Sequence, residues 1–133
     1  MKKHIQVAAA LIFEEGKILA TKRGDSPYAY VAHKYEFAGG KIESGERGED
    51  AVKRELKEEL DMDVRVGALY ASDTYEYPDF IITLWLYECE MLSNFQLKEH
   101  ESYAWIAPAD LDETDWAPAD ADILGTLKRV FGE

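Results

Sequence analysis

Three glutamates at helical spacing are the residues of this sequence whose types and positions most directly suggest chemistry. Glu55, Glu58 and Glu59 lie in the segment Arg54-Glu55-Leu56-Lys57-Glu58-Glu59. An α-helix turns by about 100° per residue, so it would place the three carboxylates within roughly a quarter of its circumference. Carboxylates at this spacing repel one another, whereas hard divalent cations such as Mg²⁺ or Mn²⁺ take several carboxylate oxygens as ligands. The cluster therefore fits either a metal site or a solvated acidic face.

The other charges of this segment can be paired along the predicted helix. Residues four apart form one row on a helix surface, and two such rows combine acidic and basic side chains. The row of Glu55 and Glu59 leads back to Ala51 and contains no cation. A cation bound between protein and phosphate would supply the missing partner. The paired rows are Glu49, Lys53 and Lys57, and Asp50, Arg54 and Glu58.

A double glycine precedes the helix. Gly39-Gly40-Lys41 ends a short stretch that we expect to be a strand, and glycines let a backbone approach a bound phosphate closely. The Gly-x-x-x-x-Gly-Lys-Ser/Thr spacing of a Walker A loop is absent from this segment. Taken alone, a double glycine is also typical of an ordinary turn.

Spacing joins the glycines to the helix in one extended motif. Gly40 is followed after five residues by Glu46, and after seven more by the glutamate segment that begins at Arg54. This resembles the Nudix box, Gly-x5-Glu-x7-Arg-Glu-apolar-x-Glu-Glu-x-Gly-apolar. Six of its seven positions of fixed identity match, and Asp61 stands where the motif has its last glycine. That glycine suits a left-handed helix cap, which Asp tolerates better than most residues, so the departure concerns the cap and not the metal site.

The resemblance continues over most of the chain. It implies a Nudix-fold α/β/α sandwich with a mixed β-sheet, and the hydrolysis of nucleoside triphosphates to monophosphate and pyrophosphate. It also implies Mg²⁺ as the cofactor, with Mn²⁺ as a substitute. Three further segments are similar to the MutT-like branch of the Nudix family, and within it to bacterial CTP pyrophosphohydrolases: Tyr35-Glu36-Phe37-Ala38-Gly39-Gly40-Lys41-Ile42-Glu43, Glu99-His100-Glu101 before Trp105, and Ala117-Pro118-Ala119-Asp120.

The resemblance further implies which groups bind the metal and activate water. One carboxylate, or a water that the ligands orient, would generate the attacking hydroxide. Glu55 and Glu99 are both candidates for this general base. Glu99 is aligned by its distance from Trp105, and a surface position in a charged loop is the alternative. The implied ligands are the box carboxylates, the carbonyl of the preceding glycine and the loop carboxylate, namely Glu55, Glu58, Glu59, Gly40 and Glu99.

Neighbouring residues receive supporting roles from the same resemblance. Arg54 completes the predicted catalytic group, and with Glu46 it matches box positions that usually form a structural ion pair. Glu101 competes with Glu99 for the position of the loop carboxylate. His100, between them, is interpreted as a surface residue rather than a ligand.

Basic residues are the candidates for binding phosphate. Arg23 and Lys22 end a predicted strand beside the loop that should overhang the site, and the guanidinium group of arginine suits bidentate phosphate recognition. Lys41, directly after the double glycine, is assigned to the substrate site as well. A strand-end arginine is also an ordinary surface residue, so both interpretations of Arg23 stay open.

Asp120 is the candidate for reading the nucleobase. The resemblance places it where relatives that prefer oxidised guanine carry Asn. An ionised Asp only accepts hydrogen bonds, so it would favour base edges that present donors, such as those of cytosine or guanine. The alternative is an Asp in the first turn of a helix after Pro118, stabilised by the helix dipole. Tyr35, with Phe37 and Tyr77, could stack on a base, although aromatic residues in strands usually belong to the core.

Apolar periodicity predicts the elements that position these groups. Val52, Leu56 and Leu60 form the apolar stripe of a helix over residues 48–60. Residues 5–13 alternate like a half-buried strand, and residues 24–32 should be an exposed loop. The order of strands, helix, strands and helix predicts an α/β or α+β sandwich. The remaining predicted strands are 17–22, 35–38, 64–72, 80–90 and 102–106, and the remaining helices are 108–111 and 118–131.

Length and composition argue against several other classes of protein. The 133 residues, 47% of them hydrophobic, fit a single domain over residues 1–133. The net charge is −12, which argues against a nucleic-acid binder and requires an anionic substrate to bring or find cations. Cys89 is the only cysteine, so an internal disulfide is excluded and a packed thiol is expected. No apolar run approaches the roughly 20 residues of a membrane span, and the N-terminal stretch does not resemble a signal peptide, so we expect a cytoplasmic protein without a membrane segment.

These observations predict an enzyme, a MutT-like Nudix hydrolase acting as a monomer or homodimer on a small nucleotide. The candidate substrates are CTP, dCTP and oxidised or modified dNTPs such as 8-oxo-dGTP, and cleaning of the nucleotide pool is the implied role. One alternative is a Nudix hydrolase of a nucleotide sugar or ADP-ribose, which the short chain and the Asp120 segment disfavour. The other is a non-catalytic nucleotide-sensing domain, which the full set of box carboxylates disfavours.

Overall fold

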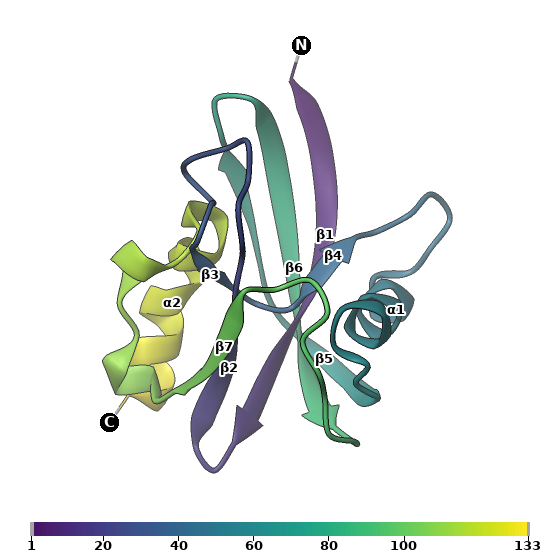
Figure 1. The fold of residues 1–133 in the computed structure, drawn as a ribbon, viewed down its shortest axis with the longest axis vertical. Helices are drawn as coiled ribbons and strands as arrows, with labels where there is room; N and C mark the ends of the chain where they lie inside the picture. The colour runs from purple at the N-terminus through teal and green to yellow at the C-terminus, as the bar shows by residue number, and fades with distance from the viewer. Residues whose placement is uncertain (1, 133) are drawn as a thin grey trace.

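The chain is built around a seven-stranded mixed β-sheet in which β1 lies between β2 and β6. The computed structural model describes residues 2–132, and Figure 1 shows the two α-helices on opposite sides of the strands. In chain order the elements are β1 (Lys3–Glu14), β2 (Lys17–Lys22), β3 (Tyr35–Glu36), β4 (Gly39–Lys41), α1 (Gly48–Leu60), β5 (Val64–Glu76), β6 (Phe80–Met91), β7 (Ser102–Ile106), the 3₁₀ turns η1 (Pro108–Asp110) and η2 (Glu113–Asp115), and α2 (Pro118–Phe131).

The central strand β1 is more deeply buried than its sequence predicts. It runs parallel to β6 and antiparallel to β2 and β4. Residues 8–12 are all buried, so the prediction of a half-buried strand is wrong for the middle of β1. The reason is that both faces are covered, because alternate residues of β1 join one core beneath α2 and another beneath α1.

The strand predicted over residues 35–38 is two short strands in the structure. β3 pairs with β2, whereas β4 pairs with β1, so the chain crosses from one strand to the next after Glu36. Gly39 lies opposite Ala9, and a Cβ at Gly39 would overlap the backbone of Ala8. Glycine therefore lets β4 lie directly against β1, from where the chain leads to α1.

Helix α1 has the predicted bounds, and its buried side chains are the predicted apolar stripe together with Ala51. Asp61 follows the helix in the left-handed conformation, with φ at 51°. Its backbone N–H donates to the Lys57 carbonyl at 3.0 Å. Asp61 thus makes the cap that glycine makes in the motif, and the departure from the motif leaves the helix intact.

Helix α2 covers the opposite face of the sheet. It begins at Pro118, as predicted, and Ile123, Leu124 and Leu127 belong to the core that also contains residues of β1 and β6. The second 3₁₀ turn, η2, was not predicted. It is capped by the Asp112 side chain, which accepts from the N–H of the residue two positions later.

Strands β5 and β6 form an antiparallel pair and extend beyond their predicted ends. Cys89 lies in β6 and packs against the core beneath α1. Burial raises the pKa of its thiol to about 12, in agreement with the expected packed thiol. Neither α-helix that the structure describes has the length and apolar character required to span a membrane.

Candidate active site

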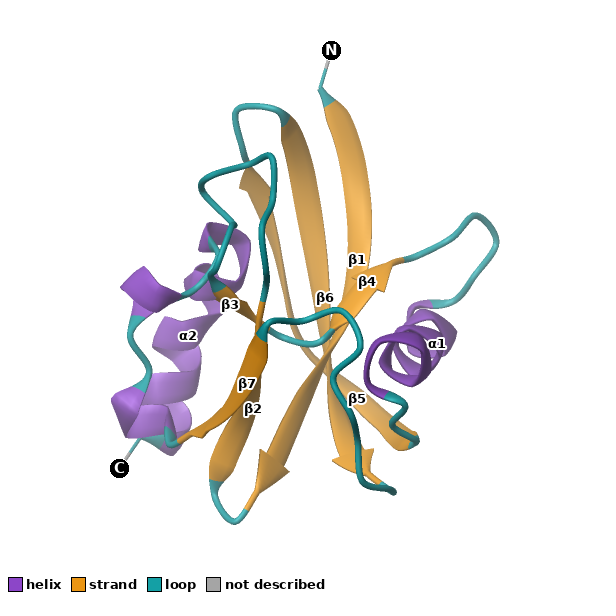
Figure 2. Cartoon of the chain, in the orientation of Figure 1, coloured by secondary structure: helices purple, strands orange, loops and turns teal. Residues whose placement is uncertain are grey.

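A cleft of about 500 Å³ opens around the crossing from β3 to β4 and reaches α1 and the start of α2. Figure 2 shows this crossing between the two helices. Residues assigned to the site from separate parts of the sequence meet at this cleft. They are Arg23, Gly40, Lys41, Glu55, Glu59 and Asp120.

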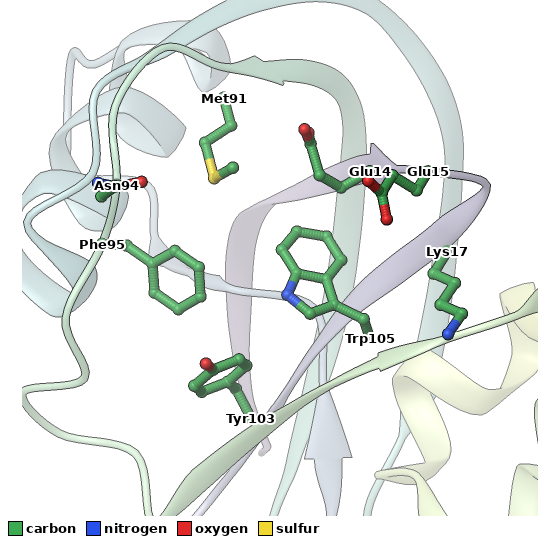
Figure 3. Close-up of a pocket in the computed structure, with 8 residues that line it drawn as sticks. All are labelled: Glu14, Glu15, Lys17, Met91, Asn94, Phe95, Tyr103 and Trp105. Atoms are coloured by element: carbon green, nitrogen blue, oxygen red, sulfur yellow. The ribbon is translucent and has the colours of Figure 1, made fainter.

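A second hollow, of about 620 Å³, lies beside the turn between β1 and β2. Figure 3 shows Glu14 and Glu15 near this turn, together with the grouped rings of Phe95, Tyr103 and Trp105. The rings of Phe95 and Tyr103 pack edge to face, with their centroids 5.0 Å apart. In the part of the chain that the structure describes, no residue predicted for the site lines this hollow. The cleft at the β3–β4 crossing is therefore the candidate active site.

Two of the three clustered glutamates, Glu55 and Glu59, face the cleft as largely buried carboxylates. The pKa of Glu59 is raised to about 9, first by burial and then by the charges of Glu36, Glu55 and Glu99. Burial also raises the pKa of Glu55, against the opposing effect of Arg54. Oε1 of Glu59 is buried, and no donor among residues 2–132 reaches it. A cation in the cleft would stabilise the charged form of both carboxylates.

Arg54 organises the other residues of the box. Its Nε and Nη2 atoms donate to the two oxygens of Glu46 at 2.8 and 3.0 Å, and Nη2 donates to the Lys41 carbonyl at 2.9 Å. The pKa of Glu46 falls to about 2, chiefly through its hydrogen bonds with Arg54. Nη1 lies 3.3 Å from an oxygen of Glu55 and 3.3 Å from an oxygen of Glu58. Glu58 is exposed and lies outside the cleft lining, so of the three clustered glutamates only Glu55 and Glu59 line the cleft.

The predicted row of Glu49, Lys53 and Lys57 does not form. Lys57 pairs with Asp61 and Asp63, just beyond the end of the helix. Glu49 pairs with Arg47, just before its start. The chain on either side of α1 thus brings partners to these charges that helical spacing alone does not reveal.

The groups around Glu59 fit a hard divalent cation. Glu59 carries a buried oxygen that meets no donor among the described residues, and the Glu55 carboxylate also lines the cleft. A Cβ at Gly40 would overlap that carboxylate, so the Gly40 backbone is directly against it. Carboxylate and carbonyl oxygens are the ligands that Mg²⁺ takes. Within residues 2–132 no three acidic, His or Cys side chains form a complete metal site, so the fit rests on the chemistry of these groups.

Glu99 lies on a loop that is attached to the end of α1. The N–H groups of Gln96 and Lys98 donate to the carbonyls of Leu60 and Glu59, at 2.7 and 3.1 Å. Glu99 itself is exposed, and its charge contributes to the raised pKa of Glu59. The loop therefore holds Glu99 on the side of the cleft where the box carboxylates lie.

The two residues that follow Glu99, His100 and Glu101, make contacts that the sequence does not suggest. Glu101 is engaged elsewhere, because its Oε1 lies 2.7 Å from Nδ1 of His33. The interpretation of His100 as a surface residue is wrong. Its side chain is only 5% exposed, and its Nε2 lies 2.9 Å from Oε2 of Glu36. The loop has no regular periodicity, so nothing in the local sequence marks this burial.

Arg23 reaches the cleft beside Glu36. Its Nη1 donates to Oε1 of Glu36 at 3.1 Å, while its side chain remains 44% exposed. Lys41 is exposed and lines the same cleft, so both cations are accessible to a phosphate. Glu36 is not among the residues predicted for the site, because its only signal in the sequence is an acidic residue among aromatic neighbours before the double glycine. Tyr35 packs against Trp116, with ring centroids 5.9 Å apart, and lies outside the cleft lining.

Asp120 lies at the end of the cleft that α2 forms. It is in the first turn of α2 and is buried, and its Oδ2 accepts a hydrogen bond from the Phe37 N–H at 3.0 Å. Burial, followed by the charge of Glu36, raises the pKa of Asp120 to about 8. Burial thus favours the protonated carboxyl group, which can donate as well as accept a hydrogen bond. This differs from the acceptor-only Asp expected from the sequence, because the sequence does not show the burial.

Residues 24–32 form a loop that is exposed at several positions, as predicted, and that also contributes two residues to the cleft lining. Val31 is buried, and Tyr30 stacks on Tyr77 with ring centroids 4.7 Å apart. Tyr28 packs edge to face against Phe80 at 5.2 Å. Tyr28, Val31 and Phe80 also line the cleft, so part of its wall is apolar.

Comparison with known proteins decides the family. A family model described as the NUDIX domain matches residues 2–127. The chain belongs to the Nudix family. The box motif, the mixed sheet between two helices and the hydrolase class predicted from the sequence are thereby confirmed.

Two curated relatives of this Nudix chain have names that describe nucleotide hydrolysis. The 8-oxo-dGTP diphosphatase of Escherichia coli K12 is 37% identical over 130 residues, which cover 96% of this chain and 99% of the relative. The CTP pyrophosphohydrolase of the same strain is 37% identical over 123 residues, which cover 92% and 90%. The similarity to both relatives confirms the MutT-like branch.

Solved structures agree with this assignment. The solution structure of the E. coli ORF135 protein has a TM-score of 0.82 and 35% identity, covering 97% of this chain and 93% of that one. A MutT structure from methicillin-resistant Staphylococcus aureus 252 has a TM-score of 0.73 and 36% identity, covering 97% and 98%. The Nudix fold is therefore shared over nearly the full length of these proteins.

Proposed function

We propose that this Nudix chain is a Mg²⁺-dependent pyrophosphohydrolase that converts a nucleoside triphosphate to a monophosphate and pyrophosphate. The observation that carries the proposal is the pair of largely buried carboxylates, Glu55 and Glu59, in one cleft with Arg23 and Lys41. The carboxylates need a cation, and so does a triphosphate that approaches a chain of net charge −12. A cation shared by carboxylates and phosphates meets both needs. The names of the relatives support the same reaction.

The cation site would be formed by oxygen atoms on one side of the cleft. Mg²⁺, or Mn²⁺ in its place, suits such a ligand set. When bound, the cation neutralises phosphate charge and acidifies the attacking water. Arg54 would hold the box in shape through its ion pair with Glu46. The proposed ligands are Glu55, Glu59 and the carbonyl of Gly40, with Glu58 and Glu99 as further candidates.

The remaining groups would bind phosphate and accept a proton. Arg23 and Lys41 would contact the phosphate oxygens, and Arg23 can offer two parallel N–H groups. The carboxylate of Glu55 or Glu99 would take the proton from the attacking water.

The nucleobase would lie between Asp120 and the apolar wall of the cleft. A neutral Asp120 can both donate and accept, so CTP, dCTP and 8-oxo-dGTP are all candidate substrates. We propose that the chain works as a monomer or homodimer in the cytoplasm, where it would remove modified nucleotides from the pool.

A nucleotide screen with product identification tests the proposal. The substrates are CTP, dCTP, dGTP and 8-oxo-dGTP, with ADP-ribose and a nucleotide sugar included for the alternative hydrolase, each with Mg²⁺ and with EDTA. We expect a monophosphate and pyrophosphate, and only when the cation is present. Release of orthophosphate, preference for ADP-ribose or the sugar, or full turnover in EDTA would contradict the proposal. Binding without turnover would identify a nucleotide-sensing domain instead.

A further inference from the structure

The loop that carries Glu99 is fastened on both sides of this residue. Before it, the Lys98 N–H donates to a carbonyl in the last turn of α1 at 3.1 Å. After it, the Glu101 N–H donates to the Lys22 carbonyl of β2 at 2.8 Å. Between these two attachments the His100 side chain turns into the protein. His100 thereby connects the loop to β3, on which Glu36 lies.

His100 makes its buried hydrogen bond through one ring nitrogen. Nε2 lies 2.9 Å from Oε2 of Glu36, and the two side chains are only 5% and 16% exposed. Nδ1 is buried and meets no partner within residues 2–132. A proton on Nδ1 would be a buried, unpaired donor, whereas a proton on Nε2 meets a carboxylate oxygen. Nε2 is therefore the donor, and the bond belongs to the stronger class in which one partner is charged.

Glu36 divides its two oxygens between His100 and Arg23. Oε2 pairs with His100, and Oε1 accepts from Nη1 of Arg23 at 3.1 Å. Donors on both oxygens fix the orientation of this carboxylate. Without the buried donor, Glu36 could turn away and leave Arg23 without its anchor.

We propose that His100 is a positioning residue for substrate binding, which holds Arg23 in the cleft by donating a hydrogen bond to Glu36. The proposal rests on the proposed function, because it takes Arg23 as the phosphate ligand. Neither His100 nor Glu36 needs to touch the substrate. An arginine that is 44% exposed would otherwise sample many rotamers, and fixing it beforehand lowers the entropy lost on binding. The effect should therefore appear in KM rather than in kcat.

A double-mutant cycle between His100 and Arg23 tests the proposal. His100→Leu removes the donor and should lower kcat/KM for CTP about tenfold, mainly through KM, as expected for a hydrogen bond to a charged group. In an Arg23→Ala background the same change should cost less than about twofold, because the anchored side chain is gone. His100→Gln can place an amide N–H near the Nε2 position and should restore most of the KM. His100→Asn carries its amide closer to the backbone and should not restore it.

Controls separate positioning from general destabilisation. The same three changes at His4 of β1, whose Nε2 lies 2.7 Å from Oγ1 of Thr83, should leave KM unchanged. Thermal unfolding is measured for every variant. Equal losses from His100→Leu in both Arg23 backgrounds, or failure of His100→Gln to recover KM, would overturn the proposal. If His100→Leu does not fold, the KM values of His100→Gln and His100→Asn test the proposal, and equal values would overturn it.

A failure of the proposed function would be visible separately. If the wild-type chain hydrolyses none of the nucleotides, the proposed function is rejected. The double-mutant cycle is then repeated with the affinity for tripolyphosphate in the presence of Mg²⁺, measured by calorimetry, as the readout. Binding that is about tenfold weaker in His100→Leu, but unaffected by this change in the Arg23→Ala background, would support the positioning role. Additive losses, or no binding of tripolyphosphate by the wild type, would overturn it.

Discussion

At the scale of single residues, the candidate site contains groups that do not favour the folded state by themselves. Glu59 keeps one oxygen buried with no donor in the described part of the chain, and Asp120 is buried within range of the Glu36 charge. A buried carboxylate costs free energy unless it is neutralised or paired. Such groups are expected where a protein accepts some loss of stability for the sake of function.

Replacing Glu59 by Gln should separate the contribution of this residue to turnover from its effect on stability. Turnover with Mg²⁺ should fall by about 10²–10³-fold, because a carboxylate ligand is lost. The unfolding temperature in EDTA should stay the same or rise, since a neutral amide replaces a carboxylate whose buried oxygen has no donor. Steady-state kinetics and thermal unfolding provide both readouts, with Glu49→Gln on the same helix as the control. Turnover like that of the wild type would remove Glu59 from the proposed cation site.

Replacing Asp120 by Asn should change how base preference depends on pH. The pKa of Asp120 is about 8, so the wild-type carboxyl group loses its proton above this pH and can then only accept hydrogen bonds. It should therefore favour CTP, which offers an amine, over UTP increasingly as the pH rises from 6.5 to 9. The Asn variant cannot ionise, so its ratio of kcat/KM values should stay constant. If the CTP/UTP ratio of kcat/KM depends on pH in the same way in the wild type and the Asn variant, Asp120 does not read the base and only stabilises the start of α2.

The same proton affects stability. A folded-state pKa raised above the unfolded value stabilises the protein at low pH, and this stabilisation is lost as the pH rises through about 8. The Asn variant should therefore lose less unfolding temperature than the wild type between pH 7 and pH 9.

Residue roles were predictable from sequence where the spacing is local. Glu55 and Glu59 share a helix, and a fixed number of residues links them to Gly40. The pair of His100 and Glu36 could not be predicted in this way, because 64 positions separate the two residues and neither lies in a periodic segment. Only the folding of the loop onto β3 brings them together.

At the scale of elements, features set by the local sequence could be predicted, whereas features set by contacts with distant segments could not. The bounds of α1 follow from its own apolar stripe and a cap residue at its end. The separation of β3 from β4 depends on two different partner strands, so the local sequence of residues 35–41 could not reveal it. The burial of β1 on both faces likewise depends on helices that lie far away in the chain.

The contact between β5 and α2 contains an acidic pair. Asp73 of β5 has one buried oxygen with no donor among residues 2–132, and Asp122 of α2 is its charged neighbour. Burial, followed by Asp122, raises the pKa of Asp73 from 3.8 to about 6. The helix is therefore packed most favourably when the pair retains a proton.

Asp73→Asn should stabilise the protein near neutral pH. Because the folded-state pKa is raised, the stabilisation is complete below about pH 4 and is lost as the pH rises through about 6. The substitution should raise the unfolding temperature by about 2–5 °C at pH 7.5 and by much less at pH 4. Thermal unfolding at both pH values tests this, with the exposed Asp115→Asn as the control. An equal rise at both pH values would show that the pair does not act through its charge.

At the scale of the whole molecule, the net charge of −12 disfavours both folding and the binding of an anion. The cleft offsets the effect of this charge on anion binding, because it brings together Arg23 and Lys41 with carboxylates that can hold a cation. These residues come from the loop after β2, from β4 and from α1, so the site exists only once the sheet and α1 have assembled.

Mg²⁺ should therefore stabilise the whole chain. A ligand at about 100 times its Kd adds about 2.7 kcal/mol, so the unfolding temperature should rise by several degrees and fall again on addition of EDTA. NaCl at equal ionic strength only screens charge and should produce a smaller rise. Glu59→Gln should respond alike to both salts. An identical response of the wild type to Mg²⁺ and to NaCl would argue against a specific cation site.

The attachment of the Glu99 loop to α1 has a consequence for local opening. The amides of Gln96 and Lys98 lie in a segment without regular structure, yet they donate to the last carbonyls of the helix. Their protons can exchange with solvent only when this end of α1 opens, so hydrogen exchange should show them protected in step with Leu60. The loop and the helix would then form one cooperative unit, and any fluctuation that releases Glu99 would also loosen Glu59.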